Sequence, residues 1–232
     1  MGFVNMNSPE IRPIRECLPS ERFIAAMQKY VNGEGNPKVS IIGNNTMRDV
    51  MRSVNEIPSQ TYSFEIEFYG HNGTGHKAYL VSGIEKGLVA GEFLKSSDFG
   101  LETKERTVTI KQGRGIVILQ KHAVDQNGNI IPDVVEEFAV VKVTTGEQII
   151  IPSGYFYALV NTNKDDVLVA QHSSPRIKDS GNPNSQVLRN MRGFAYRVVA
   201  ADSHVCLEPN KNYKKIKTLK DGKIPSVGQN LD

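Results

Sequence analysis

The chain has 232 residues, of which 39% are hydrophobic and 23% charged, and its formal net charge is +3. That balance is typical of a globular domain with extensions, and so small a charge gives no argument for nucleic acid or an anionic membrane as a partner. The first residues lack the basic start and apolar run of a signal peptide, no apolar run is long enough to cross a bilayer, and the two cysteines form no paired framework. We therefore expect a soluble cytoplasmic protein.

Three parts follow one another along the chain. Residues 1–55 form an arm with short helices, residues 56–209 form a β-rich domain, and residues 210–232 form a basic tail that we expect to be solvated and partly disordered. In the middle part, short runs of alternating or apolar residues are separated by turn residues, which is typical of a sandwich or barrel. The expected strands are 62–69, 77–82, 92–95, 106–110, 116–121, 134–143, 148–151, 156–161, 167–172 and 194–200.

A short amphipathic helix is expected ahead of the β-rich domain. Ser20 is a suitable N-cap. The apolar residues that follow it share one helical face, namely Phe23, Met27, Tyr30 and Val31. Because this face needs a covering surface, we expect the helix to pack against the chain's own barrel. A second segment, 46–54, has a weaker helical pattern.

Residues 146–161 are the most informative stretch. Gly146 begins a turn, three isoleucines follow as a buried strand, and Pro152-Ser-Gly154 makes a sharp corner before the next strand. The stretch resembles the second cupin motif, G-x5-P-x-G-x2-H-x3-N, at every signature position except the histidine, which is Tyr157 here. It therefore indicates a barrel and questions the metal chemistry usually done inside one.

Further segments, in the same order along the chain, resemble the cupin-type phosphoglucose isomerases over roughly residues 45–215. They are 45–51, 62–66, 93–95, 106–115, 151–162 and 208–213. The resemblance implies an all-β fold, the cupin double-stranded β-helix (jelly-roll) barrel, here with an N-terminal helical extension. It also implies interconversion of glucose 6-phosphate and fructose 6-phosphate, a bound metal ion, and a homodimer.

The positions of that family's metal ligands have changed in this chain. Carried over one residue at a time, three histidines and one glutamate fall at Ser97, Phe99, Tyr157 and Arg106, with Glu105 one position from the last. Transition metals in such sites want imidazole and carboxylate ligands, and a guanidinium repels a cation. The sequence therefore predicts no metal and no other cofactor.

Histidines elsewhere leave an alternative metal site open. His71 and His76 bracket a glycine-rich loop, where we expect them to face solvent. His122 and His172 stand at strand ends, where a hydrogen-bonded structural role is expected.

The interior residues suggest chemistry without a metal. Arg106 is suited to binding a phosphate or carboxylate, and Lys95 adds a second positive charge. Tyr157 can act as an acid or base if a nearby cation lowers its pKa from about 10. Ser97 and Tyr155 complete the candidate ligand-binding residues.

Two functions follow from these residues. The first is an isomerase- or epimerase-type enzyme, or a binding protein, for a small anionic metabolite such as a phosphorylated or acidic sugar. The alternative is a non-catalytic barrel that binds a ligand or has a structural or interaction role. In that case Arg106 pairs with Glu105, Glu136 or Glu137, and Tyr157 only fills the core.

Overall fold

The protein was studied as a computed structural model, which describes residues 21–31, 38–42, 63–72, 75–89, 91–96, 101–102, 104–173, 186–201 and 204–220. The predictions for the N-terminal arm, Ser20 and the helix at 46–54 lie outside these ranges. The described elements are α1 (Glu21–Val31), β1 (Lys38–Ile42), β2 (Ser63–Asn72), β3 (Gly75–Ile84), β4 (Leu88–Val89), β5 (Glu92–Phe93), β6 (Arg106–Gln112), β7 (Arg114–Val124), β8 (Ile130–Thr144), β9 (Gln148–Ile151), β10 (Phe156–Val160), β11 (Leu168–His172), α3 (Val187–Asn190), β12 (Tyr196–Ala201), β13 (His204–Pro209) and β14 (Lys215–Lys220).

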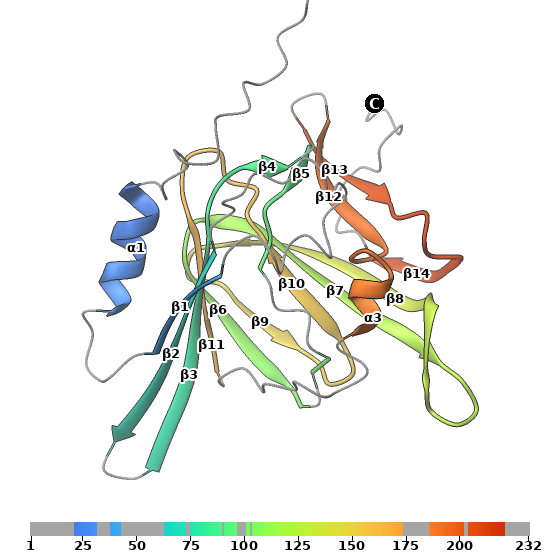
Figure 1. Cartoon of the computed structure of the whole chain (residues 1–232), viewed down its shortest axis with the longest axis horizontal. Coiled ribbons are helices and arrows are strands. Elements are labelled where there is room, and N and C mark those ends of the chain that lie inside the picture. The colour runs from blue at the N-terminus through green and yellow to red at the C-terminus, as the bar shows by residue number, and fades with distance from the viewer. Residues whose placement is uncertain are drawn as a thin grey trace, which may run out of the picture.

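The strands form three sheets around a barrel (Figure 1). The first sheet has the order β1-β2-β3-β11-β6-β9, the second β10-β7-β8-β14 and the third β13-β12-β5-β4. Consecutive strands β6 and β7 pair with β11 and β10, one pair in each of the first two sheets. Two antiparallel pairs that wind together in this way make a double-stranded β-helix, so the predicted all-β jelly-roll barrel is confirmed.

Strands β10 and β7 of the second sheet are buried on both faces over most of their length, which explains their nearly continuous apolar sequences. All five residues of β10 are buried. Tyr157 and Leu159 face an inner cluster, which fills the barrel between the first and second sheets. Phe156, Ala158 and Val160 face an outer cluster, which is covered by α3 and the third sheet.

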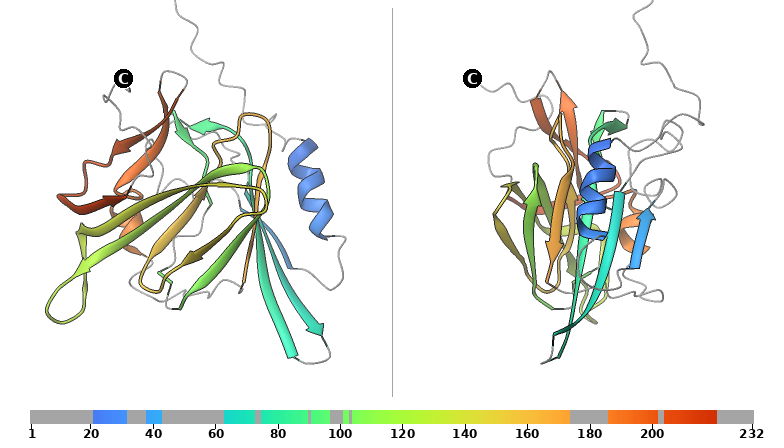
Figure 2. Two further views of the ribbon diagram at one scale, coloured as in Figure 1. Left: turned by 180° about the vertical axis from the view of Figure 1, so that it is seen from behind. Right: turned by 90° about the vertical axis from the view of Figure 1, so that its left-hand side faces the viewer.

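Helix α1 covers the outside of the first sheet, as expected. It begins at Glu21, the residue after the expected N-cap, and it packs against β3 and β2 (Figure 2). Phe23 is fully buried and Ala26 is 4% exposed, whereas Met27 is half-buried. The side chains of Tyr30 and Val31 lie outside the described part. No helix in the described ranges has the length and apolar character of a membrane span.

The corner in residues 152–154 forms as predicted. Gly154 has φ +85°, which a residue with a Cβ rarely adopts. Its backbone N–H donates to the Glu102 carbonyl at 2.7 Å. The corner therefore both aims Tyr157 into the barrel and brings the segment of Glu102 alongside.

The basic tail is more ordered than expected. Residues 215–220 form β14, which pairs in parallel with β8. The reason is charge complementarity with β8, because three of its carboxylates meet two lysines of β14 and the lysine just before it. The pairs are Lys214–Asp133, Lys217–Glu136 and Lys220–Glu137. Residues 221–232 lie outside the described ranges.

Candidate active site

Four polar side chains from four strands meet inside the barrel and form a hydrogen-bonded series, here called the interior chain. Arg106 of β6 donates from Nη1 to the Tyr157 hydroxyl at 3.2 Å. The same hydroxyl lies 2.9 Å from Nδ1 of His172 on β11. His172 Nε2 lies 2.8 Å from Oγ of Ser82 on β3. None of the four residues is more than 3% exposed.

Strand register explains why these residues meet. Residues two apart on a strand share a face, so Arg106 points inward with Val108 and Ile110 of the inner cluster. His172 is the Cα partner of both Val108 and Leu80, which places β11 between β6 and β3. The sequence-predicted pair Arg106 and Tyr157 is thus brought together, and the structure adds His172 and Ser82.

Glu102 balances the charge of Arg106. Its Oε2 lies 3.1 Å from the Arg106 Nε, and Glu102 is only 7% exposed. The Glu102 N–H donates to the Tyr155 carbonyl at 2.9 Å, which fixes the segment beside the corner. The expected carboxylate partners of Arg106 were Glu105, Glu136 and Glu137, but Glu136 and Glu137 pair with Lys217 and Lys220, and Glu105 is exposed. Glu102 is beside Arg106 instead, because the neighbouring Leu101 forms a β-bridge with Phe156.

The direction of the hydrogen bonds in the interior chain follows from Arg106 at one end, which can only donate. A guanidinium only donates, so the Tyr157 oxygen accepts from Arg106. When the hydroxyl proton is donated to His172 Nδ1, His172 carries its own proton on Nε2 and donates it to Ser82. Arg106, Tyr157, His172 and Ser82 then form one directed series in which Tyr157 and His172 can exchange a proton.

The described residues do not fit the divalent metal of the resembled family. Arg106 places a fixed positive charge 3.2 Å from the one oxygen that Tyr157 offers. Both ring nitrogens of His172 are within hydrogen-bond distance of other side chains. Within the described ranges, no three His, Cys, Asp or Glu side chains gather in a way that would hold a metal. Ser97 and Phe99 lie outside those ranges.

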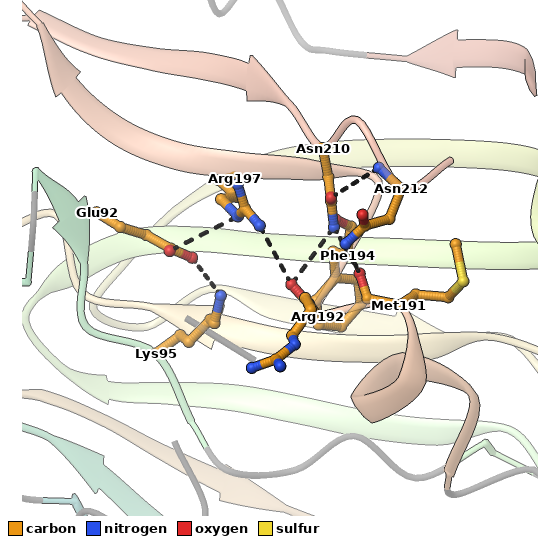
Figure 3. A network of polar contacts seen from close by, with 8 residues as sticks. All are labelled: Glu92, Lys95, Met191, Arg192, Phe194, Arg197, Asn210 and Asn212. Atoms are coloured by element: carbon orange, nitrogen blue, oxygen red, sulfur yellow. Dashed lines mark hydrogen bonds and ion pairs between the residues drawn. The ribbon is translucent and has the colours of Figure 1, made fainter. Parts of the chain in front are cut away.

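Lys95 does not take the predicted position beside Arg106. Its ammonium is ion-paired with Glu92, and Arg197 lies 4.0 Å from the other oxygen of that carboxylate (Figure 3). The reason is alternation along the extended segment, because Leu94 joins the inner cluster and Phe93 the outer cluster. Lys95 follows Phe93 outward, so its charge lies with Glu92 and Arg197 of the third sheet.

Tyr155 lies at one end of the barrel in a group that we call the mouth cluster: Lys121, Glu137, Tyr155 and Lys220. The Tyr155 hydroxyl donates to Glu137 at 3.0 Å, and Lys220 donates to the other carboxylate oxygen at 2.9 Å. The hydrogen bond from Lys220 lowers the pKa of Glu137, with smaller contributions from Tyr155 and Lys121. Burial and the nearby Glu137 raise the pKa of Tyr155.

His122 belongs to a separate network on the outer face, which we call the outer network: Gln120, His122 and Tyr213. Gln120 Nε2 donates to His122 Nε2 at 2.6 Å and to the Tyr213 hydroxyl at 3.0 Å, and His122 Nδ1 lies 3.4 Å from the Ile131 carbonyl. Burial lowers the pKa of His122 to about 4. The expected hydrogen-bonded structural position is therefore found for His122.

His71 and His76 do not bracket a loop. They are Cα partners within the paired strands β2 and β3. Period-two alternation was visible only up to residue 69, and both strands continue beyond it. Their side chains lie outside the described part.

Comparison with known proteins identifies the family. The family model described as Glucose-6-phosphate isomerase (GPI) matches residues 83–215. No curated protein matches the chain. Among solved structures, the chain is similar to a cupin 2 conserved barrel domain protein from Rhodopseudomonas palustris (11% identity, TM-score 0.37, 61% of this chain and 74% of that chain covered). It is also similar to Drosophila melanogaster CENP-C bound to CAL1 (12% identity, TM-score 0.33, 64% of this chain and 93% of that chain covered). A third similar structure is the capsular polysaccharide assembling protein CapF from Staphylococcus aureus (17% identity, TM-score 0.36, 62% of this chain and 31% of that chain covered). Because the family model spans more than half of the sequence, the chain belongs to the glucose-6-phosphate isomerase (GPI) family.

Proposed function

We propose that this protein is a diverged, metal-free member of the family that binds an anionic sugar and moves a proton on it with Tyr157 and His172. One observation carries the proposal: the Tyr157 hydroxyl lies 3.2 Å from a guanidinium nitrogen and 2.9 Å from an imidazole nitrogen. A hydroxyl held in this way has a cation to stabilise its ionised form and a base to take its proton.

The chemistry of an isomerase or epimerase suits this pair. Such reactions remove a proton from a carbon beside a carbonyl group and return it elsewhere, so they need one group that alternates between acid and base. Tyr157 would be that group, and His172 would hold the hydroxyl proton while Tyr157 is ionised. Arg106 would stabilise the ionised oxygen, and Glu102 would hold the guanidinium in place through the 3.1 Å contact at Nε.

This assignment changes the role first expected for Arg106. Its charge is already balanced by Glu102, a carboxylate of the same chain. A guanidinium that is 3% exposed and ion-paired attracts an external anion less than an open one does. Arg106 is therefore a positioning and stabilising group for Tyr157 in this proposal, and the anion of the sugar is bound elsewhere.

A non-catalytic barrel is the second candidate, and a specific observation favours it. Tyr157 is fully buried, and Arg106 contacts both the Tyr157 hydroxyl and the Glu102 carboxylate. A filled core in which buried polar groups are paired with one another has the same appearance. In this case Tyr157 takes the space of the lost histidine and the barrel serves a binding or interaction role.

Turnover of sugar phosphates in a purified Tyr157→Phe variant separates the two. The change keeps the ring and removes only the hydroxyl, so we expect kcat for interconversion of glucose 6-phosphate and fructose 6-phosphate, or of a related sugar phosphate, to fall by roughly a hundredfold or more. Tyr213→Phe is the matched control, because Tyr213 is also a buried, hydrogen-bonded tyrosine but lies in the outer network.

Metal dependence is tested in the same assay. We expect wild-type turnover to be unchanged by a chelator and by added divalent metal. Loss of activity with chelator would show that the metal-free assignment is wrong. Absence of turnover in the wild type, with Tyr157→Phe changing stability alone, would favour the non-catalytic barrel.

A further inference from the structure

The mouth cluster forms the layer directly next to the reacting end of the interior chain. Tyr155 precedes Tyr157 by two residues, so the two side chains share a face and their Cα atoms are about 6.6 Å apart. Across the sheet, Leu119 is the Cα partner of Tyr157, and Lys121 follows Leu119 by two residues. Lys121 is in turn the Cα partner of Glu137. Lys121, Glu137 and Tyr155 therefore sit one layer out from Tyr157.

The mouth cluster carries more positive than negative charge. Lys220 donates to the single carboxylate of Glu137, and Lys121, the Cα partner of Glu137, places its ammonium 6.0 Å from the centre of the Tyr155 ring. The Lys220 side chain is 62% exposed and that of Glu137 24% exposed, so the carboxylate lies underneath and the ammonium groups face solvent. The next pair along β14 differs, because Lys217 meets Glu136 one to one and both are about equally exposed.

Strand β14 supplies one of these charges. The family match ends at residue 215, whereas β14 continues to Lys220. Pairing of β14 with β8 places Lys220 opposite Ala139 of the inner cluster, on the barrel side of the sheet. Lys220 is thus a feature of this chain's own C-terminal strand.

We propose that Lys121 and Lys220 form an anion-recognition site that holds the phosphate or carboxylate of the sugar at the barrel mouth. The proposal rests on the proposed function for the reacting end at Tyr157. Ammonium groups act only as donors and suit an acceptor-rich anion. The mouth cluster and Tyr157 are separated by about two strand residues. This separation suits a sugar whose charged group and reacting carbons are at opposite ends of its chain. Glu137 keeps both lysines in place when the site is empty.

Titration with inorganic phosphate and with glucose 6-phosphate at low ionic strength tests the site, with binding measured by calorimetry or NMR. We expect Lys121→Met and Lys220→Met each to weaken binding about three- to tenfold, and the double variant by roughly the product. Lys217→Met is the matched control, with the same charge on the same strand, and should leave the affinity within about twofold.

Glu137→Gln provides an outcome of opposite sign. It removes the one negative charge of the mouth cluster, so we expect phosphate to bind a few-fold more tightly, whereas a purely structural role for Glu137 predicts no gain. Equal affinity in all lysine variants, an equal loss in Lys217→Met, or no binding of either probe by the wild type would overturn the site.

Failure of the site and failure of the proposed function give different results. If the lysine variants lose phosphate affinity while Tyr157→Phe converts sugar phosphate at the wild-type rate, the anion site is supported and the acid–base role of Tyr157 is wrong. If Tyr157→Phe is inactive while the lysine variants bind phosphate like the wild type, the mouth site falls alone.

Discussion

The two faces of the second sheet each bury a histidine and a tyrosine, and they do so in different ways. In the outer network, Gln120, His122 and Tyr213 form neutral hydrogen bonds, and the Tyr213 hydroxyl donates to the Gly193 carbonyl at 2.8 Å. In the interior chain, Tyr157 and His172 are joined to a buried guanidinium–carboxylate pair. One network is neutral and the other is charged, although both lie against the second sheet, on its strands β7 and β10 respectively.

Stability alone explains only the neutral network. Neutral polar groups with every bond made are nearly free of cost in a core. A buried ion pair loses much of its Coulomb energy to desolvation, and apolar residues of the same volume are often as stable. The inner face therefore keeps a buried ion pair that packing does not require, as the Glu92–Lys95 pair on the outer side also does. Only the inner pair lies beside a hydrogen-bonded tyrosine and histidine, and the proposed function rests on that arrangement.

Breaking the buried ion pair should give the largest effect. Glu102→Gln leaves the Arg106 guanidinium buried without its carboxylate, so we expect the free energy of unfolding in urea to fall by about 3–5 kcal/mol. Glu105→Gln is the control on the same segment, because Glu105 is exposed, and it should change stability by less than about 0.5 kcal/mol. The double variant Glu102→Gln/Arg106→Met should recover part of the loss. Equal, small losses in Glu102→Gln and Glu105→Gln would show that the pair is not buried as described.

The outer network should show itself through pH. Burial lowers the pKa of His122 from 6.5 to about 4. Between these pH values, His122 is therefore protonated in the unfolded chain and neutral in the folded protein. Stability is therefore fully present above pH 6.5 and is lost as the pH falls toward 4, by about 3 kcal/mol in total. His122→Gln should flatten this slope in urea unfolding, and His204→Gln, at an exposed position, should not. An unchanged slope in His122→Gln would assign the acid sensitivity to other groups.

Much of the barrel could be predicted from the sequence because its signals are local. Apolar runs and turn residues predicted β6 to β12, and the motif at 146–161 predicted the corner at Gly154. β14 was missed because its lysines are satisfied only by Asp133, Glu136 and Glu137, which lie far away in the chain. Short elements such as β4 and α3 are too brief to show a period.

The candidate site was predictable only where a motif fixed the register. Carrying the family positions over placed Arg106 and Tyr157 on inward faces, and the two residues do meet. No motif in the sequence pointed to Glu102 or His172. Their contacts depend on which strands are neighbours in the folded sheets, and local sequence does not show that. Lys95 was misjudged because one extended segment borders both clusters, and its direction depends on the third sheet, which no local pattern defines.

Removing one hydroxyl from each network compares the two faces directly. Tyr157→Phe and Tyr213→Phe each lose hydrogen bonds in a buried setting, so both should lower the free energy of unfolding by about 1–3 kcal/mol. Only Tyr157→Phe should also abolish turnover. Loss of activity in both variants, in proportion to their stability, would mean that the two faces differ in charge but not in function.

The smallest effect should come from the exposed ion pairs of β14. Lys217 and Glu136 are 43% and 45% exposed, so their attraction is screened by water and salt. We expect Lys217→Met to change the free energy of unfolding by less than about 0.5 kcal/mol, and Lys220→Met by little more, because Glu137 keeps its bond from Tyr155. Phosphate affinity should nevertheless separate the two variants, since Lys220 lies on the barrel side of the sheet and opposite a residue of the inner cluster. If Lys217→Met and Lys220→Met are equally stable but bind phosphate unequally, then β14 contributes to the mouth cluster through the charge of Lys220 and not through packing.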